Sequence, residues 1–145
     1  MVNELNAVLK ELGGRRTFRR VFHTQDELRS AIREGFPATA IHELMAAASL
    51  SLQELAHCLD LSVRSLQRRR HRGRLAQYES DRLYRLARIV ALAEQSLGDH
   101  ERGIRWLKKS NVSLGGSVPI EALDTELGAR RVEEALGRVA YGGVS

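Results

Sequence analysis

The sequence predicts an all-helical protein, and three observations support that fold class. Leu, Ala, Glu and Arg dominate the 145 residues, and all four are good helix formers. Only two prolines and 5% aromatic residues argue against a β-sandwich. Apolar side chains recur at spacings of three and four residues, and capping residues or glycines bound most of these stretches. With 43% hydrophobic residues, the chain can also bury a core.

Two helices are expected in the first 35 residues. The first starts at Asn3 and stops at Gly13-Gly14. Its apolar face is formed by Leu5, Val8, Leu9 and Leu12. Residues 15–22 should be irregular or form a short strand. The second helix opens with a capping box, Thr24-x-x-Glu27, and should stop at Gly35.

Three short helices should follow. Pro37 suits the first turn of the first one. Its apolar residues, at helical spacing, are Ile41, Leu44, Met45 and Ala48. Ser51-x-x-Glu54 is a second capping box and opens the next helix. A tight break at Asp60-Leu61 separates it from the third, which should end near Gly73.

A long helix should run from about residue 80 to residue 97. Its inward stripe consists of Leu83, Leu86, Val90, Ala93 and Leu97. Gly98 should end it, and Asp99 can cap the helix that follows.

The last part begins with a loop over residues 110–117. Pro119 then starts a helical turn, and Thr125 opens a last helix that should end at Gly142-Gly143. The apolar residues of that helix are Leu127, Val132, Leu136 and Val139.

The break at Gly98 is the best place to divide the chain. We expect an N-terminal extension of unknown role over residues 1–35, a central domain over 36–98 and a C-terminal domain over 99–145. The formal charge of +5 is distributed unevenly, with +2, +3 and zero in these three parts. A basic surplus in the first two parts favours an anionic partner there.

Composition and motifs exclude several classes of protein. No apolar stretch approaches the ~18 residues of a membrane span, and the N-terminus carries no secretory signal pattern. We therefore expect a cytoplasmic protein with no membrane partner. The single cysteine, Cys58, excludes an internal disulfide framework and a Cys-based zinc finger.

No catalytic, metal or cofactor site is expected. The five histidines lack H-x-x-H and H-E-x-x-H spacing, and neither a phosphate loop nor a G-x-S-x-G motif is present. His57 and Cys58 are helix neighbours that point about 100° apart, so they are poor joint ligands. Cys58 fits a small buried filler, and Trp106 fits a core or interface residue.

Residues 52–71 have the pattern of a helix-turn-helix, in which two short helices are separated by a tight turn. Ala56 lies where the helices approach, and Ser62 can cap the second helix. Asp60 occupies the turn position that glycine usually holds, and Arg69 occupies a position that is usually apolar. The apolar groups that such a unit must bury are Leu55, Leu59, Leu61 and Leu66.

The second of these helices has a basic outward face. Its first two turns would enter the major groove, where Arg can pair with guanine and Gln with adenine. No acidic residue interrupts residues 61–78, which also suits DNA phosphates. The candidate DNA-binding residues are Ser62, Arg64, Ser65, Gln67, Arg68, Arg69, Arg70, Arg72 and Arg74. The alternatives are a merely solvated basic helix and RNA binding, although the chain lacks the aromatic pairs typical of single-strand RNA readers.

The C-terminal third carries residues in a distinctive order and spacing. They are Arg105-Trp106-Leu107, Asn111, Leu114-Gly115-Gly116, Pro119, Leu123, Gly128, Val132, Leu136-Gly137-Arg138 and Gly142. Together with the helix-turn-helix, the pattern over residues 36–143 resembles the Xre/MbcA/ParS-type antitoxins, whose partners are RES-domain toxins. Residues 1–35 are not part of this resemblance.

The resemblance implies a mechanism. RES toxins resemble ADP-ribosyltransferases and consume cellular NAD, and the antitoxin's terminal segment projects into the toxin's active site. On this basis the candidate toxin-binding residues are Arg138, Val139, Ala140, Tyr141, Gly142 and Gly143. An ordinary frayed C-terminus is the alternative. The family's helix-turn-helix binds double-stranded operator DNA at its own promoter and represses transcription.

A homodimer is expected, because one small helix-turn-helix buries little area on DNA and two copies read a palindrome. The stripe from Leu83 to Leu97 or the C-terminal domain could supply the contact. The alternative function is a stand-alone transcriptional regulator without a toxin. A third hypothesis, an enzyme, is not expected. A RES-like reading frame beside this one would favour the antitoxin.

Overall fold

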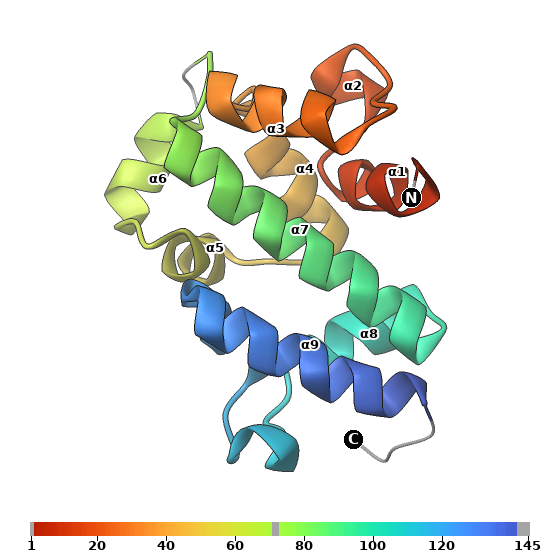
Figure 1. The fold of residues 1–145 in the computed structure, drawn as a ribbon. Coiled ribbons are helices and arrows are strands. Elements are labelled where there is room, and N and C mark those ends of the chain that lie inside the picture. Colours follow the sequence, from red (N-terminus) through yellow and green to blue (C-terminus); the bar gives the residue numbers. More distant parts are fainter. Residues whose placement is uncertain (1, 71–72, 142–145) are drawn as a thin grey trace.

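The computed structural model describes residues 2–70 and 73–141, and every regular element in these ranges is helical (Figure 1). The predicted all-α class is thus confirmed. The α-helices are α1 (Val2–Glu11), α2 (Arg15–Phe18), α3 (Gln25–Glu34), α4 (Thr39–Ala48), α5 (Leu52–Leu59), α6 (Val63–Arg69), α7 (Gln77–Leu97), α8 (His100–Leu107) and α9 (Glu126–Ala140). The 3-10 helices η1 (Val112–Leu114) and η2 (Pro119–Asp124) lie between α8 and α9.

The long helix α7 is the element on which most others pack. α1, α3, α4, α5, α8 and α9 all contact it, so its inward stripe lies at the centre of the core (Figure 1). The predicted stripe is buried at Leu83, Leu86, Val90 and Ala93, whereas Leu97 is only half-buried near the helix end.

Several predicted boundaries are wrong by a few residues. Residues 15–18 form a turn of helix rather than a strand. α7 begins at Gln77, because the Glu79 carboxylate accepts the N–H of Ala76 at 2.8 Å and caps the helix earlier than predicted. Pro37 precedes α4 instead of lying in its first turn, and α6 ends at Arg69 instead of near Gly73.

The early end of α6 has a physical reason. The chain that follows it returns to the segment before α4, where the N–H of Leu75 donates to the carbonyl of Phe36 at 2.8 Å. The N–H of Ala38 likewise donates to the carbonyl of Gly73. Gly35 permits this close approach, since a Cβ there would lie 2.1 Å from the carbonyl oxygen of Leu75. Its φ of +96° also suits glycine.

The helix-turn-helix part and the C-terminal part pack directly on each other through α5 and η2. The ring of His57 donates to the carbonyl of Glu121 at 2.8 Å. Cys58 is buried beside it, and its Sγ donates to the carbonyl of Ile120 at 3.4 Å. Burial raises the pKa of the Cys58 thiol to about 12, so it stays protonated and unreactive near neutral pH. The prediction of a buried filler is confirmed.

Trp106 lies in the core of the C-terminal part, and its indole N–H is buried without a partner among the described residues. No helix in the described ranges is both long and apolar enough to cross a bilayer. Within the same ranges, no three His, Cys, Asp or Glu side chains are grouped so that they could hold a metal ion.

Candidate nucleic-acid and protein interfaces

Two short helices, α5 and α6, meet at a tight turn with the geometry expected of a helix-turn-helix. Asp60 adopts the left-handed conformation (φ 56°) that glycine usually supplies, and the N–H of Leu61 donates back to the carbonyl of Ala56 at 2.9 Å. Ala56 is buried between the helices, as predicted. Leu55, Leu59 and Leu66 are buried too, whereas Leu61 is half-buried.

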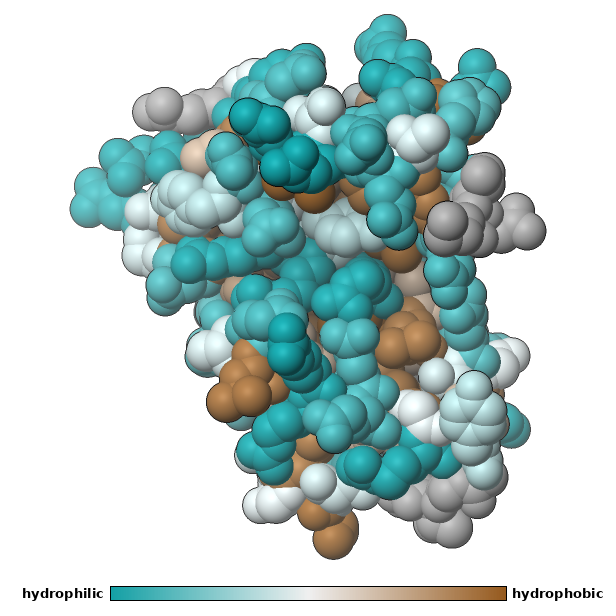
Figure 2. Space-filling view, viewed as in Figure 1, coloured by the Kyte–Doolittle hydropathy of each residue, from teal (hydrophilic) through white to brown (hydrophobic). Residues whose placement is uncertain are grey.

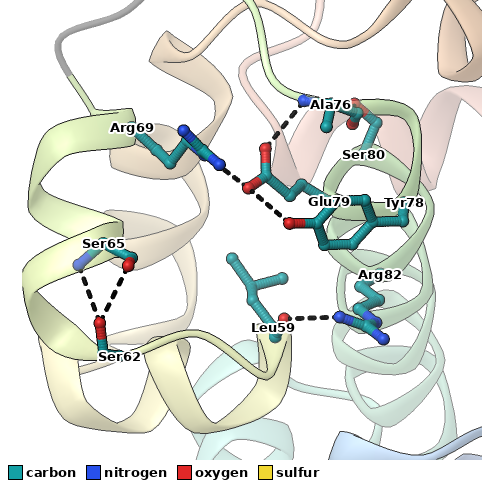
Figure 3. A network of polar contacts seen from close by, with 9 residues as sticks. All are labelled: Leu59, Ser62, Ser65, Arg69, Ala76, Tyr78, Glu79, Ser80 and Arg82. Carbon is teal, nitrogen blue, oxygen red and sulfur yellow. Dashed lines mark hydrogen bonds and ion pairs between the residues drawn. The ribbon is translucent and has the colours of Figure 1, made fainter.

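Each helix of this unit begins with a side-chain cap. At α5 the box is reciprocal, because Ser51 Oγ accepts the N–H of Glu54 at 3.0 Å and the Glu54 carboxylate accepts the N–H of Ser51 at 2.8 Å. At α6, Ser62 Oγ accepts the N–H of Ser65 at 3.0 Å and its hydroxyl donates to Ser65 Oγ (Figure 3). Both predicted caps are therefore formed.

The outward face of α6 carries Arg64, Gln67 and Arg68, which are all exposed. Their spacing of three and four residues places them on one side of the helix, opposite the buried Leu66. Two guanidinium groups and an amide in this arrangement provide paired donors for guanine and a donor–acceptor pair for adenine.

The other candidate DNA-binding residues are held by the fold. Arg69 Nε donates to the Glu79 carboxylate at 2.6 Å, and Arg74 Nη1 donates to the carbonyl of Gly35 at 2.8 Å. Arg70 contacts the ring of His42, with Nη2 3.0 Å from Nδ1. Arg72 lies outside the described residues.

Glu79 is the central group of the polar network between the end of α6 and the start of α7 (Figure 3). Its carboxylate is fully buried and accepts hydrogen bonds from Arg69, from the N–H of Ala76 and from the Tyr78 hydroxyl at 3.4 Å. The hydrogen bond and the charge of this carboxylate raise the pKa of the Arg69 guanidinium. The end of α6 is therefore fixed to the start of α7.

Two further contacts in the network fix α5 and the segment before α4 to α7. Arg82 Nη1 donates to the carbonyl of Leu59 at 3.0 Å, at the end of α5. Buried Ser80 accepts the N–H of Phe36 at 2.8 Å and donates to the carbonyl of Ala76. The sequence pattern did not single out Glu79, Ser80 or Arg82. Arg69, at a position that is usually apolar, was a signal that a buried acidic partner was needed.

In the C-terminal part, α9 buries one face formed by Ala129, Val132, Ala135 and Leu136. Arg85 Nη2 of α7 donates to the carbonyl of Leu123 at 3.1 Å, and Arg88 pairs with Glu133 at 2.7 Å. The first contact joins η2 to α7, and the second joins α9 to α7. Leu127, which the sequence grouped with the apolar residues of this helix, is 71% exposed.

The candidate toxin-binding residues lie at the end of α9. Arg138, Ala140 and Tyr141 are exposed, whereas Val139 packs partly against the core. Gly142 and Gly143 lie outside the described residues. α6 lies at one end of the molecule and the C-terminal end of α9 at the other, so the two candidate surfaces are well separated (Figure 1).

Comparison with protein-family models finds two consecutive matches. Residues 27–88 match the antitoxin Xre-like helix-turn-helix domain. Residues 92–142 match the antitoxin Xre/MbcA/ParS C-terminal toxin-binding domain. The two matches together cover most of the chain.

Among curated proteins, the chain is similar to several named antitoxin Xre. The one from Pseudomonas putida is 36% identical over 117 residues, which are 80% of this chain and 72% of the relative. The one from Yersinia enterocolitica is 33% identical over 114 residues, or 77% of each chain. The one from Photorhabdus laumondii is 29% identical over 120 residues, or 81% of each chain.

Proposed function

The chain belongs to the family of Xre antitoxins, which are DNA-binding proteins with a toxin-binding domain rather than enzymes, and we propose that its toxin is a RES-domain protein that consumes cellular NAD. The observation that carries the proposal of a toxin partner is the match of residues 92–142 to a toxin-binding domain, and two separate surfaces on one molecule fit binding to both DNA and a toxin. The exposed arginines of α6 lie at one end, and the exposed end of α9 lies at the other.

The C-terminal segment, Arg138 to Gly143, would neutralise the toxin by occupying its active site. The Arg88–Glu133 ion pair and the packing of α9 on α7 and η2 would aim this segment. Tyr141 supports the proposal, since a 93% exposed aromatic side chain at a helix end suits insertion into a partner better than contact with water. A segment inserted in this way would exclude NAD.

The helix-turn-helix would repress the operon by binding its promoter as a homodimer. Arg64, Gln67 and Arg68 are the side chains that we assign to base edges, because they are exposed on one face of α6. Arg70, Arg72 and Arg74 follow them in the chain and add positive charge beside that face, which favours DNA phosphates. Two copies spaced by one helical turn would read a palindromic site.

A pair of variants tests this division of labour. Arg64→Ala combined with Arg68→Ala should abolish operator binding in a mobility-shift assay, because the base contacts and two phosphate-attracting charges are lost. The same variant should still restore growth and NAD levels in cells that express the proposed RES-domain toxin. A chain truncated after Gly137 should show the reverse pattern.

Circular dichroism of both variants controls for folding. Loss of rescue in the folded Arg64/Arg68 variant would contradict the separation of the two surfaces. A wild-type chain that binds its operator but neither binds nor neutralises the neighbouring gene product would instead favour a stand-alone regulator.

A further inference from the structure

A groove of about 550 Å³ runs between the second half of α1 and the segment that continues from it to Phe22. Its volume lies in the range of about 300–1,000 Å³ that is usual for small-molecule sites. The groove is formed within residues 6–22, which precede both family-model matches, at 27–88 and 92–142. Neither match therefore assigns it a role.

The charged side chains that line this groove are all basic. Among the described residues, no Asp or Glu lines it. Glu43 pairs with Arg16 at 2.6 Å and Glu27 pairs with Arg20 at 3.2 Å, so two of the positive charges are partly compensated. Arg15 is exposed and has no ion-pair partner in the described ranges. The groove therefore keeps a positive surplus, and its cations are Lys10, Arg15, Arg16 and Arg20.

One wall of the groove is apolar and packed in place. Buried Leu9 and buried Phe22 belong to it, and the Phe18 ring meets that of Phe22 edge to face, with 5.5 Å between the centroids. The guanidinium carbon of Arg20 lies 4.5 Å from the centroid of the Phe22 ring. Val21, which is 38% exposed, and half-buried Phe18 bring apolar surface to the groove. A ligand in the groove therefore meets guanidinium groups and apolar surface together.

Two glycines form the turn between α1 and α2 at the edge of the groove. Gly13 and Gly14 have φ values of +99° and +53°, which favour glycine. A Cβ at Gly13 would lie 2.6 Å from Glu43 Cγ, so glycine is what lets the turn approach α4 this closely. The turn thus fixes where α2 begins, and with it the positions of Arg15 and Arg16.

We infer that this groove binds a small phosphorylated molecule with a flat apolar group, of the nucleotide class. Arginine forks match phosphate oxygens with paired, charge-assisted hydrogen bonds. Arg15, Arg16 and Arg20 supply such forks from one short segment. The apolar wall covers the flat group, and the guanidinium of Arg20 can stack on it. The inference concerns neither the operator nor the toxin, so it does not rest on the proposed function.

DNA beside the operator is another phosphate-rich ligand, but the position of the groove argues against it. α6 lies at the left of the molecule, whereas α1 and α2 lie at the right (Figure 1). The surface of the N-terminal part is mostly hydrophilic, with small apolar areas between the polar side chains (Figure 2). A duplex would contact exposed charges there but leave the apolar wall of the groove uncovered. The observations therefore favour a small ligand.

Calorimetric titration of the purified full chain tests the inference, with adenosine monophosphate, adenosine and inorganic phosphate as separate probes. Adenosine monophosphate should bind at least about tenfold more tightly than adenosine or phosphate, because it uses the basic and apolar parts of the groove together. Arg15→Glu should lower its affinity by about tenfold or more, since an attractive charge becomes repulsive. Arg15 has no ion-pair partner to lose in the described ranges, so this variant should remain folded.

Arg19→Glu is the matched control, because Arg19 is an exposed arginine of the same segment that does not line the groove. It should change the affinity by less than about threefold at physiological salt. Arg20→Ala is a second variant, which removes the guanidinium on the apolar wall without adding a negative charge. It should also weaken binding of adenosine monophosphate. Circular dichroism of each variant checks its folding.

The possible outcomes separate the inference from the proposed function. Equal binding of inorganic phosphate and adenosine monophosphate would show that the groove holds any anion, and equal losses in Arg15→Glu and Arg19→Glu would place binding outside it. Either result would overturn the inference. No binding of adenosine monophosphate at about 1 mM would overturn it too, and weaker operator binding by Arg15→Glu would then identify a DNA surface. A wild-type chain that fails to bind operator or toxin would overturn the proposed function alone.

Discussion

Glu79 fixes the end of α6 to the start of α7, although it does not lie on the exposed face of α6. It is fully buried, and it accepts hydrogen bonds from Arg69, Ala76 and Tyr78. A buried carboxylate is tolerated only when it is paired and hydrogen-bonded in this way. Its removal leaves Arg69 without its partner and α7 without its cap.

Glu79→Ala should therefore lower the free energy of unfolding by about 3 kcal/mol. It should also weaken operator binding, because the end of α6 is no longer fixed. Urea unfolding measures the first effect and a mobility-shift assay the second. Asp81→Ala, an exposed acid on the same helix, is the matched control and should change stability by less than about 0.5 kcal/mol. Equal effects of the two substitutions would contradict the role of Glu79.

Glu11 on α1 is a second buried carboxyl group, and its raised pKa makes the stability of the fold depend on pH. Burial raises its pKa to about 8, with further contributions from the hydrogen bond and the charge of Glu94 on α7, and Lys10 opposes the shift. Glu94 also contacts His100 at the start of α8. The folded state therefore keeps a proton on Glu11 that the unfolded chain releases near its ordinary pKa of 4.5.

The sign of the pH effect follows from this difference in proton binding. Between about pH 4.5 and pH 8 the folded state binds more protons at Glu11, so this residue makes stability fall as the pH rises. Glu11→Gln should remove that contribution. The difference in urea midpoint between variant and wild type should thus increase steadily from pH 5 to pH 8. A difference independent of pH would show that Glu11 is ionised throughout.

At the scale of the elements, side-chain caps set where the helices of the DNA-binding unit begin. The capping box at Ser51 is reciprocal, and Glu54 also lies 3.5 Å from Lys108 Nζ at the end of α8. The start of α5 is therefore fixed both by its own cap and by the C-terminal part.

Ser51→Ala should lower the free energy of unfolding by about 1 kcal/mol, because an N–H at the start of α5 loses its acceptor. Ser51→Asn retains an oxygen at the cap and should lose much less. Thermal or urea unfolding of the two variants provides the comparison. Equal losses would mean that the cap oxygen does not stabilise the helix.

Local signals predicted these elements well, because a cap and its partner lie only three residues apart. The caps at Ser51, Ser62, Asp99 and Thr125 all form as the sequence indicated. Helix ends that depend on distant residues were not predictable. α6 stops at Arg69 because the following chain pairs with the segment before α4, a contact that no local pattern encodes.

The candidate surfaces were also predicted only in part, because local sequence patterns do not encode contacts between distant residues. The exposed face of α6 follows from helical spacing, but the engagement of Arg69 by Glu79 and of Arg74 by the carbonyl of Gly35 depends on tertiary packing. Leu127 was grouped with the apolar residues of its helix, although it lies five residues before Val132 and off the buried face. The DNA- and toxin-binding roles of individual residues remain predictions.

At the scale of the whole molecule, the two surfaces belong to one packed body. Contacts between α5 and η2 join the helix-turn-helix to the C-terminal part, with His57 and Cys58 donating to the carbonyls of Glu121 and Ile120. We therefore expect the toxin to be carried to the operator without rearrangement of either surface. The basic surplus lies in residues 1–98, whereas residues 99–145 are neutral, which suits a protein partner.

If the end of α9 blocks the toxin while the rest of the chain holds it, inhibition and binding should be separable. The most direct test is to measure NAD consumption by the proposed RES-domain toxin, after purification, while it is titrated with the full chain or with a chain truncated after Gly137. The full chain should abolish NAD consumption at saturation. The truncated chain should bind the toxin and leave NAD consumption largely intact. Equal inhibition by the two chains would contradict the claim.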